Sequence, residues 1–160
     1  VPGATNAVIV TSASKSWNLA ALKAGLIVGD PAVLRRLGPL VSDGASYFGI
    51  LAHSAALTDG RDWLADAAAE IEGNKLFFRD QLAEHLPALT YEPAPGTYLA
   101  WLDCAPLGLA SPGRHFHEVA RVRFNLGTDF APTATQHVRV NLATSKEIIA
   151  EAVARMRASL

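Results

Sequence analysis

The segment of this sequence best suited to covalent chemistry contains a lysine among small hydroxyl residues. Lys15 follows the apolar run 7–10 and lies between Ser14 and Ser16, and a second cation, Lys23, stands eight positions later. An amine at the end of a buried strand can lose its proton through desolvation and a nearby cation, and can then attack a carbonyl to form a Schiff base. The neighbouring hydroxyls and Lys23 can hold a phosphate of the same ligand. The alternative is that Lys15 is a solvated surface residue.

A second candidate is an arginine in an apolar strand pattern. Arg139 stands between Val138 and Val140. A cation in such a strand needs an anionic partner, because an unpaired buried charge is costly. The partner is either a carboxylate of the chain, which would make Arg139 a structural ion-pair residue, or a bound anion. Asn141 is expected to order the end of the strand.

The histidines and the single cysteine do not fit the residue patterns of metal sites or of cysteine nucleophiles. His115 and His117 lack a carboxylate or cysteine at ligand spacing, and alternate positions on a helix point apart, so we expect no metal site. Cys104 has no histidine paired with it locally and follows a strand that looks buried, which disfavours a nucleophilic role. The sequence has no Gly-rich phosphate loop of the Rossmann or P-loop type.

Composition narrows the range of partners. Half of the 160 residues are hydrophobic, and the formal net charge is −1, which argues against nucleic acid or an anionic membrane as the main partner. One cysteine allows no intrachain disulfide and favours a reducing compartment, the cytoplasm. No apolar run approaches the roughly 20 residues that cross a bilayer. The start, Val1-Pro2-Gly3, resembles no signal peptide and lacks methionine, so we expect the chain to begin inside a larger protein.

The first third of the chain contains too few elements to form a domain. Asp30-Pro31 is a helix start, with Asp as N-cap and Pro at the first helical position. Two strands and one helix cannot cover both faces of a sheet, so these residues need partners from elsewhere. The expected elements are strands over 7–10 and 23–28, a helix from 31 to 40 or 41, a loop over 42–46 and a helix over 47–57.

The remainder of the chain predicts a long helix followed by a small α/β unit. Apolar residues at three- and four-residue spacing indicate a helix from Arg61 to His85, with Lys75 on its apolar face. Thr144-Ser145-Lys146-Glu147 has the capping-box pattern of a terminal helix. The other expected elements are strands over 90–92, 97–102, 122–126 and 137–142 and a helix over 112–120; Trp63, Tyr98 and Trp101 are expected in the core.

Several segments together resemble a known family. Ser12-x-Ser14-Lys15 followed by Ser-Trp-Asn is similar to the cofactor-lysine segment of fold-type I pyridoxal-phosphate enzymes. Trp63-Leu64, Gly73-Asn74, the segment 96–103 (Gly-Thr-Tyr-Leu-Ala-Trp-Leu-Asp) and the segment 138–144 (Val-Arg-Val-Asn-Leu-Ala-Thr) follow in that family's order. The resemblance spans nearly the whole chain, and it is to aminotransferase class I/II, most of all its cystathionine β-lyase (MalY/PatB-type) branch.

The resemblance implies roles for individual residues. Lys15 matches the lysine that holds pyridoxal 5′-phosphate and acts as general base at the substrate α-carbon, and Ser12 and Lys23 match residues that contact the phosphate. Lys23 could instead be a solvated strand residue. Arg139 matches the arginine that clamps the substrate α-carboxylate with two parallel donors. The chain has Ala131 where relatives tend to have glycine, and a positive φ there would add strain.

The resemblance also implies a fold and a function. The fold class is α/β, the C-terminal part of an aspartate aminotransferase-like fold: residues 1–50 end the large cofactor domain, 51–86 are linking helices, and 87–160 form the small domain. The implied function is a pyridoxal-phosphate-dependent carbon–sulfur β-lyase acting on amino acids of the cystathionine or cysteine type, as a homodimer. The alternatives are an aminotransferase that uses the same residues, and a truncated, non-catalytic assembly module.

Overall fold

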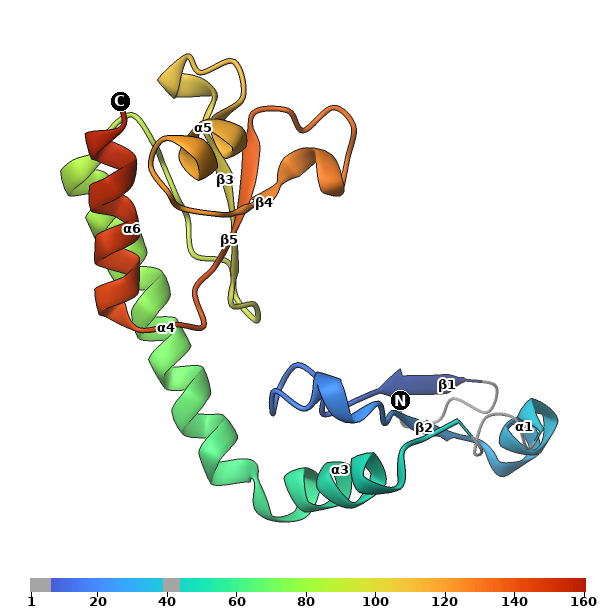
Figure 1. Cartoon of the computed structure of the whole chain (residues 1–160). Helices are drawn as coiled ribbons and strands as arrows, with labels where there is room; N and C mark the ends of the chain where they lie inside the picture. Colours follow the sequence, from blue (N-terminus) through green and yellow to red (C-terminus); the bar gives the residue numbers. More distant parts are fainter. Residues whose placement is uncertain (1–6, 39–43) are drawn as a thin grey trace. The chain divides into compact units, whose positions relative to one another are not determined.

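The computed structural model describes residues 7–38 and 44–160 (Figure 1). The chain divides into two compact units, Val1–Ala67 and Ala68–Leu160. Helix α4 (Arg61–His85) begins in the first unit and ends in the second. Within the described ranges, none of the helices combines the length and apolar character needed to cross a bilayer.

The first unit contains a two-stranded antiparallel sheet. Strand β1 (Val8–Thr11) pairs with β2 (Leu26–Gly29), with Val8 opposite Gly29 and Thr11 opposite Leu26. Both strands lie where the sequence predicts them, although β2 begins three residues later than expected. The prediction that the strand before Lys15 is buried is wrong for this chain, because all four residues of β1 are exposed. Two strands alone have no layer to cover their faces.

The helix that follows β2 is shorter than predicted. The Asp30 side chain accepts a hydrogen bond from the Ala32 amide at 2.7 Å, and Pro31 occupies the first helical position of α1 (Pro31–Leu34), as expected. A 3-10 turn, η2 (Arg35–Leu37), continues the chain to Gly38, whose φ of 72° ends it. The predicted end of this helix at 40 or 41 and part of the predicted loop 42–46 lie outside the described residues.

Helix α3 (Tyr47–Asp59) starts where the sequence predicts a helix and runs two residues further. Ser46 caps it by accepting a hydrogen bond from the Gly49 amide at 3.3 Å. Gly49 packs closely on the 3-10 turn η1 (Ala20–Leu22), since a Cβ at this position would clash with the Leu22 carbonyl. Tyr47 and Phe48, in the first turn of the helix, are both 73% exposed.

The second unit packs helices on one face of a three-stranded antiparallel sheet. The strand order is β3 (Leu99–Asp103), β5 (His137–Asn141), β4 (Asn125–Leu126). Figure 1 shows α4 and α6 (Lys146–Ala158) running side by side, and α5 (Pro112–Glu118) contacts β4 and β5. The bounds of α4 are those that the periodicity predicts.

The core of the second unit joins one face of the sheet to the helices. Val138 and Val140 of β5 are buried, and they alternate with Arg139, which lies on the opposite face. Phe78 of α4 and Val153 of α6 complete this layer and are at most 2% exposed. The period of two in β5 therefore places the arginine on the face away from the core.

Several sequence predictions need correction in the second unit. The predicted strand 97–102 is Leu99–Asp103, and the predicted helix 112–120 ends at Glu118. Residues 90–92 form no strand; instead the buried Tyr91 ring packs at 5.3 Å from that of Phe78. Only Asn125 and Leu126 of the predicted strand 122–126 pair with β5. Trp101 is 45% exposed rather than a core residue. The terminal helix starts one residue late, with Ser145 as its N-cap.

A further correction concerns the first unit, where Trp63 is 53% exposed rather than in the core.

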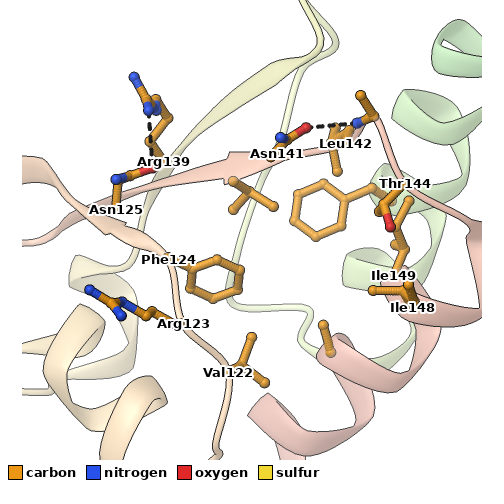
Figure 2. A pocket seen from close by; sticks show the side chains of 14 residues that line it. Val122, Arg123, Phe124, Asn125, Arg139, Asn141, Leu142, Thr144, Ile148 and Ile149 are labelled. Carbon is orange, nitrogen blue, oxygen red and sulfur yellow. Dashed lines mark hydrogen bonds between the residues drawn. The ribbon is translucent and has the colours of Figure 1, made fainter. Parts of the chain in front are cut away.

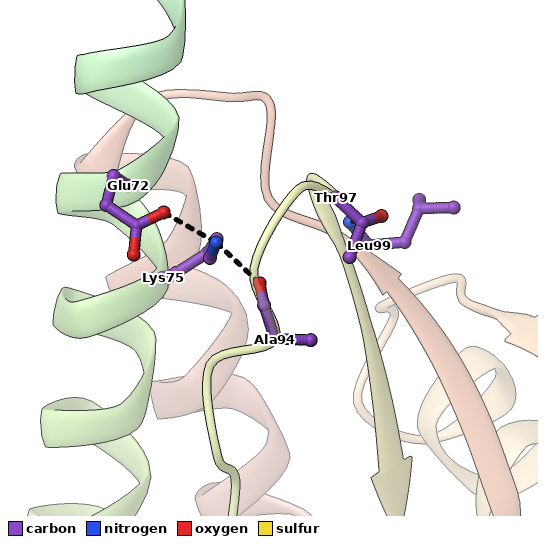
Figure 3. A network of polar contacts seen from close by, with 5 residues as sticks. All are labelled: Glu72, Lys75, Ala94, Thr97 and Leu99. Atoms are coloured by element: carbon purple, nitrogen blue, oxygen red, sulfur yellow. Dashed lines mark hydrogen bonds and ion pairs between the residues drawn. The ribbon is translucent and has the colours of Figure 1, made fainter. Parts of the chain in front are cut away.

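Two buried polar side chains of α4 connect distant segments of the second unit. Asn74 Nδ2 donates to the carbonyls of Leu142 at 3.1 Å and Thr144 at 2.6 Å. Lys75 Nζ donates to Glu72 Oε2 at 2.5 Å and to the Ala94 carbonyl at 2.7 Å (Figure 3). These bonds fix the exit from β5 and the loop that leads into β3, because each buried donor needs its acceptor.

Candidate functional site

Lys15 lies in the turn that follows β1. The turn closes with a hydrogen bond from the Trp17 amide to the Ala13 carbonyl at 3.1 Å, and the Lys15 side chain is exposed. Ser12, half-buried at the end of the strand, accepts a hydrogen bond from the Ser14 amide at 3.3 Å. The amine and the hydroxyl therefore occupy one short, hydrogen-bonded turn.

Trp17 anchors this turn to the end of α3. Its Nε1 donates to the Gly60 carbonyl at 2.8 Å. The contact requires glycine, because a Cβ at position 60 would lie 2.6 Å from Trp17 Nε1. The local sequence does not predict this pairing, which joins residues 43 positions apart.

Lys23 lies in the loop before β2, not within the strand as predicted. Its backbone is left-handed, with φ 54° and ψ 53°, and its carbonyl accepts a hydrogen bond from the Ser46 amide at 3.3 Å. Asn18 is also left-handed, with φ 55°. Non-glycine residues rarely adopt this conformation, and such strain clusters at functional sites. The Lys23 side chain is exposed.

Arg139 lies on the outer face of the second unit's sheet, in the middle strand. Trp101 of β3 and Asn125 of β4 are its direct neighbours on the two sides. Arg139 Nη2 donates to Asn125 Oδ1 at 3.0 Å, and Figure 2 shows this bond beside β5. The guanidinium carbon lies 4.3 Å from the centroid of the Phe130 ring, which is a cation–π contact.

The Arg139 cation has no acidic partner in the part of the chain that the structure describes. The arginine and lysine ion pairs found there are Lys75–Glu72, Arg79–Asp80 and Arg155–Glu151. Arg139 Nε is buried and also lacks an acceptor. A guanidinium with one hydrogen bond to a neutral amide keeps its full charge and most of its donors for an anion.

Aromatic rings surround this arginine on the same face. The Trp101 and Phe130 rings meet edge to face at 5.7 Å, and Trp101 stacks on His137 at 5.4 Å. Trp101 and Phe130 are each about half exposed. The sequence does not predict the roles of Asn125, Phe130 and Trp101 around Arg139. Residue alternation in the strands is a signal for Asn125 and Trp101, whereas Phe130 lies in a loop that has no such periodicity.

The loop that carries Phe130 is fixed by local hydrogen bonds. It begins with the 3-10 turn η4 (Gly127–Asp129), and the amides of Phe130 and Ala131 both donate to the Gly127 carbonyl, at 3.0 and 3.1 Å. Asp129 accepts a hydrogen bond from the Leu126 amide at 3.1 Å. Ala131 does not have a positive φ. The backbone strain considered for alanine at this position therefore does not arise.

The end of β5 borders a cavity of about 390 Å³. Figure 2 shows Phe124, Val122 and Ile149 among its lining side chains. Asn141 Oδ1 accepts a hydrogen bond from the Ala143 amide at 2.9 Å, so Asn141 orders the strand end as predicted.

Thiol and metal chemistry have little support in this structure. Burial, followed by the charge of Asp103, raises the pKa of the Cys104 thiol to about 12. The thiol is therefore protonated at neutral pH, whereas the thiolate is the nucleophile. Within residues 7–38 and 44–160, no cluster of three or more histidine, cysteine or acidic side chains is arranged to hold a metal ion.

The predicted site residues fall into two groups. Ser12, Lys15 and Lys23 belong to the first unit, and Arg139 belongs to the second, with its neighbours Asn125 and Phe130. Within the first group, the structure brings Ser12 and Lys15 into one turn and places Lys23 at the far end of the connection between β1 and β2.

Comparison with known proteins identifies the family. The model of the family described as "Aminotransferase class I and II" matches residues 1–156. A Mycobacterium leprae protein named "Putative cystathionine beta-lyase" is 40% identical in an alignment 177 positions long, which covers 100% of this chain and 44% of that protein. The cystathionine beta-lyase of Corynebacterium glutamicum is 30% identical, with 98% of this chain and 43% of that protein covered.

The comparison with solved structures agrees with the comparison of sequences. A crystal structure from Corynebacterium diphtheriae, described as a "putative plp-dependent beta-cystathionase", superposes with a TM-score of 0.88 at 34% identity and covers 95% of this chain and 42% of that one. The chain belongs to the aminotransferase class I and II family, in its cystathionine β-lyase branch, and has the C-terminal part of that α/β fold. It spans about 44% of the length of the mycobacterial relative.

Proposed function

We propose that this chain is the C-terminal part of a pyridoxal-phosphate-dependent carbon–sulfur β-lyase that acts on amino acids of the cystathionine or cysteine type. One observation carries the proposed reaction: the whole chain is 40% identical to a mycobacterial relative named for cystathionine β-lyase activity. The proposed substrate class, α-amino acids, is supported by Arg139, whose guanidinium has no acidic partner among the described residues.

The residues of the first unit fit the proposed cofactor, pyridoxal 5′-phosphate. An exposed primary amine, Lys15, can bind the aldehyde, and the Ser12 hydroxyl and the Lys23 cation suit a phosphate. Asn18 and Lys23 have a left-handed backbone, a conformation that is uncommon for residues other than glycine and that clusters at functional sites. When bound, the cofactor supplies an electron sink for the carbanion at the substrate α-carbon.

The chain's own residues would contribute binding and proton transfer. Arg139 would hold the α-carboxylate with two N–H groups and so orient the α-carbon. Lys15 Nζ would accept the proton from that carbon. The carbon–sulfur bond then breaks, the electron pair leaves with sulfur, and the thiolate takes up a proton. Hydrolysis of the remaining three-carbon fragment gives pyruvate and ammonia.

An aminotransferase is the second candidate, because the matched family model carries that name. The same two residues would then bind the substrate and move its α-proton, and the carbon–sulfur bond would stay intact. The products separate the two reactions: a lyase releases pyruvate without an added keto acid, whereas an aminotransferase requires one as amino acceptor.

The proposal extends to the architecture of the whole protein. Residues 1–50 would end the large domain, 51–86 would be linking helices, and 87–160 would form the small domain. A homodimer is supported by the exposed apolar side chains Tyr47, Phe48 and Leu51 on α3. A cytoplasmic location is supported by Cys104, which is a free and buried thiol.

The test uses the full-length protein that contains this chain, incubated with L-cystathionine. We expect pyruvate release without added keto acid, and borohydride reduction followed by peptide mapping should leave the pyridoxyl group on Lys15. Lys15→Ala should lose both the label and the activity. A label on Lys23 or Lys75 would contradict the role of Lys15. Turnover that depends on a keto acid would favour the aminotransferase.

A further inference from the structure

The Arg139 guanidinium is held by two contacts that do not neutralise it. Asn125 Oδ1 accepts one hydrogen bond from Nη2 at 3.0 Å, and the guanidinium carbon lies over the Phe130 ring, 4.3 Å from its centroid. An amide oxygen and a ring quadrupole attract a cation without carrying a full negative charge. A carboxylate in either place would form an ion pair and compete with a bound anion.

The two contacts also restrict the orientation of the guanidinium. The ring contact limits the movement of the guanidinium carbon, which lies 4.3 Å from the Phe130 centroid. The bond to Asn125 Oδ1 fixes the direction of the Nη2 donor. Arg139 Nε is buried, so the donors that remain accessible belong to the Nη1 and Nη2 end.

The supports of Arg139 are themselves held in place. The Phe130 ring meets the edge of Trp101 at 5.7 Å, and the Phe130 amide donates to the Gly127 carbonyl at 3.0 Å. Asn125 lies directly opposite Arg139 in the sheet. Both supports come from one segment, 125–130, so the loop η4 links the strand neighbour of Arg139 to the ring that covers it.

We propose that Phe130 and Asn125 are positioning residues, which hold the Arg139 guanidinium uncompensated and aim its Nη1 and Nη2 donors at the substrate carboxylate. This inference rests on the proposed function, because it assumes that Arg139 binds an α-carboxylate. Phe130 and Asn125 act through Arg139 and need not touch the substrate.

The test is a double-mutant cycle in the full-length holoenzyme. Phe130→Leu keeps an apolar side chain and removes the ring, so KM for the amino-acid substrate should rise about 5- to 30-fold with a smaller change in kcat. Phe130→Tyr keeps the ring and should restore KM. Phe77→Leu is the matched control, since Phe77 faces a different cation, Lys146, at 5.8 Å; it should leave KM unchanged.

Measurements in the Arg139→Lys background distinguish failure of the positioning role of Phe130 from failure of the carboxylate-binding role of Arg139. If Phe130 acts through the guanidinium, Phe130→Leu should add little to the rise in KM that Arg139→Lys causes. A full, additive effect in that background would overturn the positioning role, as would Phe130→Tyr behaving like Phe130→Leu. If Arg139→Lys alone leaves KM unchanged, the proposed carboxylate-binding role of Arg139 fails first, and the inference fails with it.

A second pair of variants tests the neutral partner. Asn125→Ala removes the acceptor, whereas Asn125→Asp offers Arg139 a carboxylate in nearly the same position. We expect Asn125→Asp to raise KM several-fold more than Asn125→Ala, because it pairs with the cation that the substrate needs. An Asn125→Asp enzyme with KM equal to or below that of Asn125→Ala would show that charge neutrality at this position is irrelevant.

Discussion

Two basic residues of the second unit, Lys75 and Arg139, differ in the charge of their partners. Lys75 is 2% exposed, and its ammonium group has an acidic and a carbonyl acceptor, Glu72 and Ala94. Arg139 is half-buried, and its contacts to Asn125 and Phe130 are uncharged. A buried cation whose donors have acceptors within the protein contributes to the fold, whereas a cation held only by neutral groups remains available to an anionic ligand. The partners therefore distinguish the two residues better than burial alone.

Lys75→Met should destabilise the protein by about 1–3 kcal/mol, because it removes the donor to the Ala94 carbonyl while keeping a similar side-chain volume. The free energy of unfolding of the 160-residue chain, measured in urea, checks this value. Arg79→Met is the matched control, since Arg79 forms an exposed pair with Asp80, and such pairs contribute at most about 1 kcal/mol. Equal losses in the two variants would contradict the structural role of Lys75.

At the residue scale, the sequence predicted single side chains better than their partners. Arg139 lies in the strand that the sequence predicts, and Asn141 orders the strand end as expected. Asn74 was quoted as a motif residue only, because its acceptors lie 68 and 70 positions away. Contacts at such separations depend on tertiary packing, which local periodicity does not encode.

The helices of this chain follow from local signals, and the strands follow only in part. The bounds of α4 were predicted correctly from its spacing, because 25 residues give several repeats of the pattern. Segment 90–92 has strand-like residues but no partner strand, and Tyr91 packs on α4 instead. Strand β4 has only two residues, because residues 122–124 of the predicted strand do not pair with β5. Strand formation depends on a neighbour that the local sequence does not specify.

The N-cap of α6 lies one residue later than the capping-box pattern predicts. Thr144 and Glu147 match a capping box, but Ser145 is the N-cap, and its hydroxyl accepts a hydrogen bond from the Ile148 amide at 3.4 Å. The hydrogen bond with Ser145, followed by a backbone hydrogen bond, lowers the pKa of the Glu147 carboxyl below 4.5. Because the folded-state pKa is lowered, this stabilisation is present above pH 4.5 and is lost as the pH falls through the folded-state value.

Ser145→Ala should lower the free energy of unfolding by about 1 kcal/mol at neutral pH, because it removes the N-cap acceptor of α6. The deficit relative to the unsubstituted chain should shrink as the pH falls well below 4.5, where Glu147 is protonated in both proteins. Urea unfolding at several pH values measures both effects. Ser111→Ala is the control, since Ser111 is the N-cap residue of α5 but makes no side-chain cap bond. A Ser145→Ala deficit no larger than that of Ser111→Ala would refute the cap assignment.

At the scale of the whole molecule, the two units differ in how well they bury their apolar residues. The second unit has a core of side chains that are almost wholly buried, such as Leu102, Phe116 and Val153. In the first unit, Val10 is 74% exposed and Val28 is 48% exposed, although both lie in strands. The exposure agrees with the expectation that these residues need partners from elsewhere, because two strands and a short helix cannot form a closed layer. Exposed strands favour association with other chains.

The 160-residue chain alone should therefore release no pyruvate from L-cystathionine above background, whereas the full-length protein should turn the substrate over. The chain spans 44% of the length of its mycobacterial relative, and all four residues of β1, the strand that precedes Lys15, are exposed. A cofactor lysine needs a desolvated, structured surrounding to act as a base near neutral pH. The assay compares pyruvate formation by the two purified proteins at equal concentration with added pyridoxal phosphate, and the Lys15→Ala full-length variant supplies the background rate. Turnover by the chain near that of the full-length protein would show that these residues form a complete active site by themselves.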